Sequence, residues 1–167
     1  ISELPKVDLL PLPTICSGIR FQPIANFPNR DLVDSVRWFI EDLGEFEQVF
    51  ELDSLQYDPS ILGQRMVIVE VKNECGTVRD TQLIEILAPL VASASLPEQF
   101  GCRSFTIEMQ DSSRGDQRSY LWSTIPTDGV TITSPMDTMP SITFDSLGTF
   151  IVQLQISNPV CGVSTWQ

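Results

Sequence analysis

The chain has 167 residues, 42% of them hydrophobic, and its 22 acidic and 10 basic residues give a net charge of −12. Such a length permits one large domain or two small ones. The acidic balance excludes a basic footprint for phosphate, so we expect no nucleic-acid partner. No apolar run approaches the roughly 20 residues of a membrane helix, so we expect no membrane insertion.

The first forty residues predict short strands. Residues 1–13 contain three prolines and fit an extended lead-in with one edge strand, and residues 20–25 fit a second strand. Within residues 33–42, Val36, Trp38 and Ile40 share one face at period two, which predicts a strand. A helix over residues 31–43 is the alternative, because short apolar runs are ambiguous.

The rest of the first half continues the strand pattern. Residues 46–50 and 55–61 predict short strands, and residues 78–87 predict a closing one. Between them, residues 63–76 place Val67, Val69 and Val71 on one core face. The junction at residues 87–90 is short and contains a proline, so we expect limited hinge freedom there.

The second half predicts strands over residues 90–95, 105–109, 119–125, 130–133 and 141–144. A turn at Asp128 and Gly129 separates two of them. In the stretch from Gly148 to Gly162, Phe150, Val152, Leu154 and Ile156 alternate with other side chains and predict a half-buried strand. We expect residues 163–167 to belong to a final strand that this sequence does not complete, and the chain to be a segment of a longer protein.

The two halves repeat one another. Trp38 and Trp122 are 84 positions apart, Asn73 and Asn158 are 85 apart, and the cysteines recur 86 positions apart. We therefore predict two tandem domains, residues 1–88 and 89–167. Seven or so short strands with turn signals between them indicate an all-β, immunoglobulin-like sandwich for each domain, with Trp38 and Trp122 in the cores.

The four cysteines are spaced alike in both halves. Cys16 and Cys75 are 59 residues apart, and so are Cys102 and Cys161. This spacing predicts one disulfide per domain, Cys16–Cys75 and Cys102–Cys161, although three pairings are formally available. Four buried free thiols are the alternative. Disulfides require an oxidising compartment, so we expect the protein to be exported.

The second half also resembles a known family. Residues 115–133 (GDQRSYLWSTIPTDGVTIT) and 140–162 (PSITFDSLGTFIVQLQISNPVCG) are similar to the PKD (polycystic kidney disease) domain, in the tandem form of large secreted or surface proteins of Bacteroidetes. The resemblance covers about residues 90–167. Residues 7–88 match more weakly, through Cys16-Ser17-Gly18, Trp38, Gly63 and the segment from Asn73 to Gly76. Neither half has the family's Trp-Asp-Phe-Gly-Asp-Gly turn.

The resemblance implies a seven-stranded β-sandwich used as a spacer or interaction module. Proteins with such repeats are similar to gliding-motility adhesins and other cargo of the type IX secretion system. The resemblance thus implies an extracellular place on a bacterial cell surface. Its implied partners are neighbouring repeats of the same polypeptide, cell-surface proteins or polysaccharide.

Catalytic chemistry is not expected. The chain has no histidine, so a hydrolase triad would lack its usual base. Glu45 and Glu47 would share a strand face, but paired carboxylates on a strand are more often a solvated surface. Trp166, Tyr57 and Phe100 are scattered and do not form a platform for sugar rings.

Calcium is the one cofactor worth weighing. Asp111 and Asp116 lie in a loop and carry the oxygen ligands that calcium prefers, but without EF-hand spacing. Asp111 is equally suited to capping its own turn. The tripeptide Arg114-Gly115-Asp116 matches an integrin-type motif, which we attribute to chance.

The sequence thus favours a non-catalytic structural or adhesive repeat of a large bacterial surface protein. Two alternatives stay open. One is an accessory module of a secreted hydrolase, binding a glycan or a protein. The other is a subunit of a surface filament, since open edge strands can pair between chains.

Overall fold

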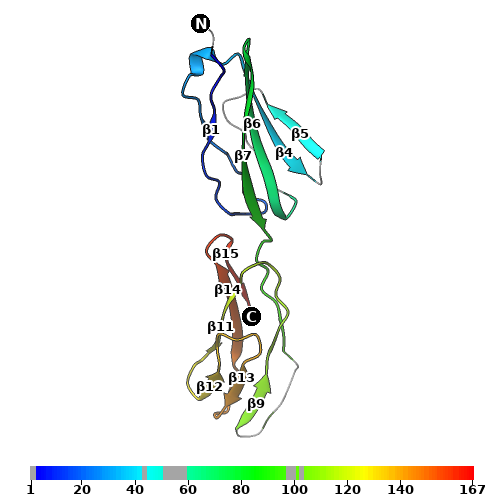
Figure 1. Ribbon diagram of the computed structural model, residues 1–167. Coiled ribbons are helices and arrows are strands. Elements are labelled where there is room, and N and C mark those ends of the chain that lie inside the picture. The colour runs from blue at the N-terminus through cyan, green and yellow to red at the C-terminus, as the bar shows by residue number, and fades with distance from the viewer. Residues whose placement is uncertain (1–2, 43–44, 51–59, 97–100, 102–103) are drawn as a thin grey trace. The chain divides into compact units, whose positions relative to one another are not determined.

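The chain folds into two compact units, Ile1–Leu87 (unit 1) and Ala88–Gln167 (unit 2) (Figure 1). The computed structural model describes residues 3–42, 45–50, 60–96, 101 and 104–167, with the backbone alone for residues 42 and 45–50. The sequence placed the boundary between residues 88 and 89, and the structure divides the chain one residue earlier. Both units are built from β-strands, and the all-β prediction is confirmed.

Unit 1 is dominated by a five-stranded sheet in the order β2-β7-β6-β4-β5. Its strands are β2 (Ile15–Cys16), β4 (Ser35–Asp42), β5 (Glu45–Phe50), β6 (Gly63–Asn73) and β7 (Gly76–Leu87). All neighbours are antiparallel except β2, which runs parallel to the end of β7. A second, small pair joins β1 (Asp8–Leu9) to β3 (Ala25–Asn26).

The helical alternative for residues 31–43 is wrong. A single 3-10 turn, η1 (Arg30–Leu32), precedes the strand β4. Residues 20–25 form less strand than expected, since only Ala25 belongs to β3. Pro23 lies in the middle of that stretch and has no N–H to contribute to a ladder. Of the strand predicted over residues 55–61, residues 55–59 lie outside the described part of the chain.

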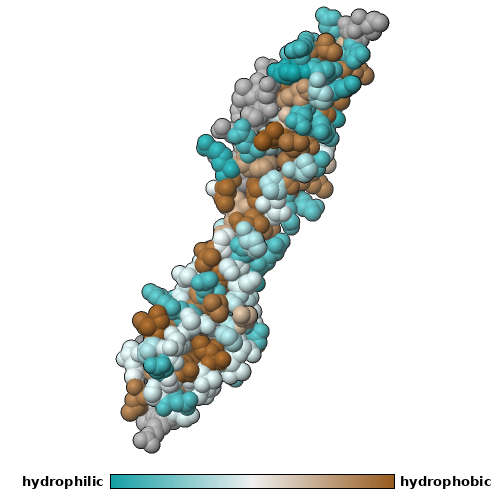
Figure 2. Space-filling view, turned by 90° about the vertical axis from the view of Figure 1, so that its left-hand side faces the viewer, coloured by the Kyte–Doolittle hydropathy of each residue, from teal (hydrophilic) through white to brown (hydrophobic). Residues whose placement is uncertain are grey.

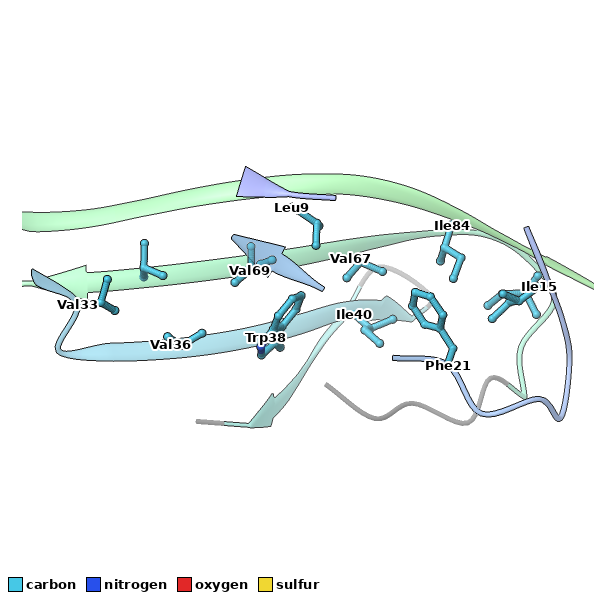
Figure 3. Close-up of a cluster of buried hydrophobic side chains, with 13 residues drawn as sticks. Leu9, Ile15, Phe21, Val33, Val36, Trp38, Ile40, Val67, Val69 and Ile84 are labelled. Atoms are coloured by element: carbon cyan, nitrogen blue, oxygen red, sulfur yellow. The ribbon is translucent and has the colours of Figure 1, made fainter. Parts of the chain in front are cut away.

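The core of unit 1 lies on one face of its large sheet. Trp38 of β4 is fully buried, and so are Val67, Val69 and Val71 of β6. Figure 3 shows Leu9 from β1 directed toward this layer. The period-two pattern read from the sequence therefore gave the correct buried face for both central strands.

Within its described residues, unit 2 has two three-stranded sheets and a short strand pair. The first sheet has the order β11-β14-β15, with β11 (Ser119–Ile125), β14 (Ile151–Asn158) and β15 (Gly162–Trp166). The second has the order β12-β13-β9, with β12 (Val130–Thr133), β13 (Ser141–Phe144) and β9 (Phe105–Glu108). The pair joins β8 (Ala94–Ser95) to β10 (Gln110–Asp111).

The strand order of unit 2 is that of an immunoglobulin constant-type sandwich. β9 and β10 can be taken as one strand that is interrupted at Met109, which joins the pair β8-β10 to the sheet β12-β13-β9. This gives one sheet of four strands and one of three, as in that fold. Met109 is buried, and its N–H bonds to the carbonyl of Pro140, the residue before β13. The predicted tandem immunoglobulin-like fold is confirmed.

The segment between β12 and β13, residues 134–140, joins the two sheets of unit 2. Buried Trp122 donates its backbone N–H to Pro135 O at 2.8 Å and its indole Nε1–H to Asp137 O at 2.9 Å. On the other sheet, Asp111 N–H bonds to Thr138 O at 3.0 Å. The segment therefore satisfies part of the open edge of β11, and Trp122 finds the partner that a buried indole requires.

The predicted disulfide between Cys16 and Cys75 is wrong. Cys75 has a free, exposed thiol, whereas Cys16 and Cys161 are both disulfide-bonded. Cys16 pairs with Leu87 at one end of β7, and Cys75 lies in the turn before the other end. A strand of this length separates them by about 36 Å, against the roughly 7 Å that a disulfide allows between Cα atoms.

The alternative of four free thiols is also wrong, because two of the cysteines are bonded. Cys102, the predicted partner of Cys161, lies outside the described residues.

The repeated asparagines explain why both hairpins end alike. Asn73 Oδ1 accepts hydrogen bonds from the N–H groups of Cys75 and Gly76, and Asn158 Oδ1 accepts them from Val160 and Cys161. Both asparagines are buried. Each amide therefore closes the turn that follows a central strand, which accounts for the Asn-to-Cys spacing in the two copies.

Candidate interaction surface

The carboxylates of both calcium candidates already accept hydrogen bonds from backbone N–H groups. Asp111 Oδ1 accepts the N–H of Ser113 at 2.9 Å, and Asp116 Oδ2 accepts the N–H of Ala88 at 2.7 Å. Across the described ranges of the chain, no three acidic or cysteine side chains gather so that they could hold a metal ion. The geometry of Asp111 and Asp116 is that of loop capping, the other role considered for Asp111.

The loop that carries the integrin-type tripeptide is bonded on several sides. Arg114 forms an isolated antiparallel bridge with Val91, through two backbone hydrogen bonds. The Asp116 carboxylate accepts a hydrogen bond from the N–H of Ala88, and the Asp116 carbonyl accepts one from the side-chain N–H of Asn158 at 2.8 Å. These contacts give the tripeptide a structural role in unit 2.

A small polar cluster stabilises the same loop. The Arg118 guanidinium donates to the carbonyl of Ser113 and lies 5.8 Å from the centre of the Tyr120 ring. Burial and the nearby charge of Asp111 raise the pKa of Tyr120 above 10.0, and Arg118 opposes them. The tyrosine is therefore neutral at physiological pH and is not an activated nucleophile.

The other sequence candidates do not form a reactive site. Glu45 and Glu47 lie on β5 opposite Asp42 and Ile40 of β4, and nothing further about their side chains is described. Trp166 packs against the core of unit 2, while Tyr57 and Phe100 lie outside the described residues. No helix in the described ranges is long and apolar enough to cross a bilayer.

The most distinctive surface of unit 2 is the outer face of the sheet β11-β14-β15. Inward residues alternate with outward ones along each strand, and the register aligns the outward ones in rows. We call their sum the uncharged face; it consists of Ser119, Leu121, Ser123, Ile125, Ile151, Gln153, Gln155, Ser157, Val163 and Thr165. None of these ten side chains is charged, although the chain carries 32 charged residues in total.

Apolar side chains on this face are well exposed. Leu121 is 44% exposed and Val163 is 61% exposed, while Ile125 and Ile151 pair directly across β11 and β14 at about half exposure. Figure 2 shows pale and brown residues over much of the visible side of unit 2, and more teal residues on unit 1. A sheet face with exposed apolar side chains and no charged ones shares the depletion of charge that marks the core of an interface.

The matching face of unit 1 is different. The outward positions of β4, β6 and β7 include six charged residues: Arg37, Glu41, Glu70, Lys72, Arg79 and Glu85. Arg79 forms an ion pair with Glu70 at 2.6 Å, and its guanidinium lies 5.9 Å from the ring centre of Phe39. The two units therefore share a fold but present chemically different sheet faces.

Sequence reasoning missed the uncharged face. The available signal was the lack of charged residues in residues 119–125, 151–157 and 163–167. Nothing in any one stretch shows that the three strands are neighbours, and only their pairing joins these positions into one surface.

Comparison with solved structures supports the fold alone. The chain is similar to extracellular domains 3–5 of Drosophila OTK, with 13% identity, 96% of this chain and 60% of that chain covered, and a TM-score of 0.57. It is similar to the I-band fragment I67–I69 of titin, with 14% identity, coverage of 97% and 63%, and a TM-score of 0.54. The three N-terminal domains of the Hoc outer capsid protein of bacteriophage RB49 share 9% identity, with coverage of 97% and 67% and a TM-score of 0.55.

The titin fragment I67–I69 consists of three immunoglobulin domains in series. The chain covers about half to two thirds of the length of the solved chains it matches first. No protein-family model and no curated protein sequence matches it. The fold and its tandem arrangement therefore define the class of protein, a pair of immunoglobulin-like domains.

Proposed function

We propose that the chain is a non-catalytic, PKD-type pair of immunoglobulin-like domains, residues 1–88 and 89–167, from a large bacterial cell-surface protein. It serves there as an interaction module and as a spacer between neighbouring repeats. The observation that carries the proposal is the uncharged face, which offers an exposed sheet surface without reactive groups.

Three further features support this role. The carboxylates of Asp111 and Asp116 are engaged in capping backbone groups. Two cysteines are disulfide-bonded, which is typical of an oxidising compartment and supports export. The fold is similar to extracellular domains 3–5 of Drosophila OTK.

The role can be tested by retention on surfaces. Beads coated with the full chain are applied to intact bacterial cells and to immobilised polysaccharides, and compared with beads carrying Leu121→Glu. We expect retention by the native chain and its loss in the variant, because a charge enters the uncharged face beside its central residue Gln155. Thr81→Glu on β7 is the matched control, since it adds the same charge to an exposed strand position of unit 1.

The outcomes separate the alternatives. Retention only on polysaccharide favours an accessory module of a secreted hydrolase, and fibres visible by electron microscopy favour a filament subunit. Equal retention of the native chain and Leu121→Glu would remove the uncharged face from the function. Hydrolysis of a bound polymer would contradict the non-catalytic proposal.

A further inference from the structure

We infer that the uncharged face binds the same face of a second copy of this chain in a weak symmetric contact. This inference rests on the proposed interaction role and names its partner. It is argued from charge, from the chemistry of the face and from its size.

Charge favours a contact between two copies at this face over one at the sheet face of unit 1. Each chain has a net charge of −12, so two copies repel one another at most orientations. The face of unit 1 would bring Glu70, Glu85 and Glu41 toward a partner, together with their cationic neighbours. The uncharged face brings no charged side chain, so no ion has to be desolvated on contact.

The face is also complementary to itself. In a two-fold contact the same patch meets itself, so each group must tolerate a copy of its own kind. Gln, Ser and Thr side chains carry both hydrogen-bond donors and acceptors, as the bond from Gln153 Nε2 to Gln167 Oε1 at 3.0 Å illustrates. Leu121 and Ile125 supply apolar surface that two copies can share. The face offers no ion pair to a partner with a charged surface.

The size of the face sets the strength of the contact. The central strand β14 has 8 residues, so the sheet plane measures about 27 Å by about 14 Å, or about 400 Å² per copy. Both copies together bury about 800 Å², which is below the roughly 1,200 Å² of stable specific complexes. The pair is therefore weak in solution.

Gln155 is the position at which the contact can be tested most directly. It lies on the middle strand, with Leu121 of β11 on one side and Thr165 of β15 on the other. A residue at the centre of a symmetric contact lies close to the two-fold axis and meets its own copy. A charge placed there is therefore repelled in pairs of identical variants and attracted in pairs of opposite variants.

Sedimentation velocity and diffusion NMR of the full 167-residue chain, from micromolar to millimolar concentration, provide the assay. The native chain is expected to be monomeric when dilute and to self-associate when concentrated, more strongly at high salt because salt screens the repulsion between copies. Gln155→Glu and Gln155→Lys should each lower the association constant at least about tenfold, the loss expected for like charges at close range. An equimolar mixture of the two should restore association.

Thr81→Glu and Thr81→Lys on unit 1 serve as controls and should associate like the native chain. Circular dichroism of each variant verifies that it is folded. A native chain that stays monomeric at millimolar concentration overturns the inference. Association that weakens as salt is added would also overturn it, as would a Gln155→Glu variant that associates like the native chain.

Failure of this inference can be told apart from failure of the proposed function. A monomeric chain whose beads still lose retention on cells with Leu121→Glu would keep the interaction role and assign a different partner. A monomeric chain without retention on any surface would contradict both the self-association and the interaction role.

Discussion

Replacement of Asn158 by alanine tests the role of the repeated asparagine. Its side chain is 5% exposed and makes three hydrogen bonds, to Val160 N at 2.8 Å, Cys161 N at 2.6 Å and Asp116 O at 2.8 Å. Each bond contributes about 1 kcal/mol net, and buried groups that lose a partner cost more. We expect Asn158→Ala to lower the free energy of unfolding of unit 2 by about 2 to 4 kcal/mol.

Urea unfolding of the oxidised chain, followed by tryptophan fluorescence, measures this loss. A loss of about 3 kcal/mol moves the midpoint by about 1 to 3 M, given the usual urea dependence for small domains. Hydrogen exchange localises the effect, because the amides of Val160 and Cys161 lose their acceptor. Ser157→Ala, one position earlier on the outer face, is the control and should change stability by no more than about 0.5 kcal/mol.

The reasoning would be refuted if Asn158→Ala cost less than about 1 kcal/mol, or if both amides kept their protection. Asn158→Asp refines the comparison because it retains the acceptor oxygen and loses the donor to Asp116. It should be intermediate between the native chain and the alanine variant.

Three further predictions concern single side chains. Trp122→Phe keeps an aromatic ring but loses the hydrogen bond to Asp137 O and leaves a cavity. The free energy of unfolding of unit 2, measured in urea, should therefore fall by about 1 to 3 kcal/mol, and no change would mean that the indole is dispensable. Cys75 should react with a thiol reagent in the folded, non-reduced chain, as peptide mass spectrometry would show, and its protection would contradict a free exposed thiol. Folding raises the pKa of Tyr120 above 10.0, so the folded state holds the phenolic proton more tightly than the unfolded state does. Unit 2 should therefore lose stability as the pH rises through that folded pKa. Tyr120→Phe should flatten this pH dependence, and an unchanged slope would mean that another group causes it.

Local periodicity was sufficient to predict much of the fold. The alternation of Val67, Val69 and Val71, and of Val152, Leu154 and Ile156, gave the buried face of each central strand, because side chains alternate across a strand whatever its neighbours are.

The second strand of unit 1 was predicted less well. Of residues 20–25 only Ala25 belongs to a strand, while Phe21 and Ile24 form single bridges, because whether a short stretch pairs depends on the backbone beside it.

The cysteines show where spacing misleads. Equal separations of 59 residues suggested equal bridges, but sequence distance does not say at which end of a strand each cysteine lies. Cys16 lies beside the end of β7 and Cys75 lies before its beginning, so a correct repeat still gave a wrong pair. Likewise, Asp111 and Asp116 had the chemistry of calcium ligands, and only the loop geometry showed that backbone N–H groups occupy them.

The sequence by itself determined the class of this protein: two β-domains, their central strands, their buried tryptophans and the asparagine that closes each hairpin. All of these depend on neighbours in sequence, on side-chain alternation or on turn chemistry. The tertiary structure decided which strands lie side by side. That pairing placed ten uncharged side chains from three separate stretches on one face of unit 2, and six charged residues on the matching face of unit 1. The chemistry of a sheet surface depends on the outward side chains of all its strands. Hydrogen bonding between segments that are distant in sequence decides which strands those are.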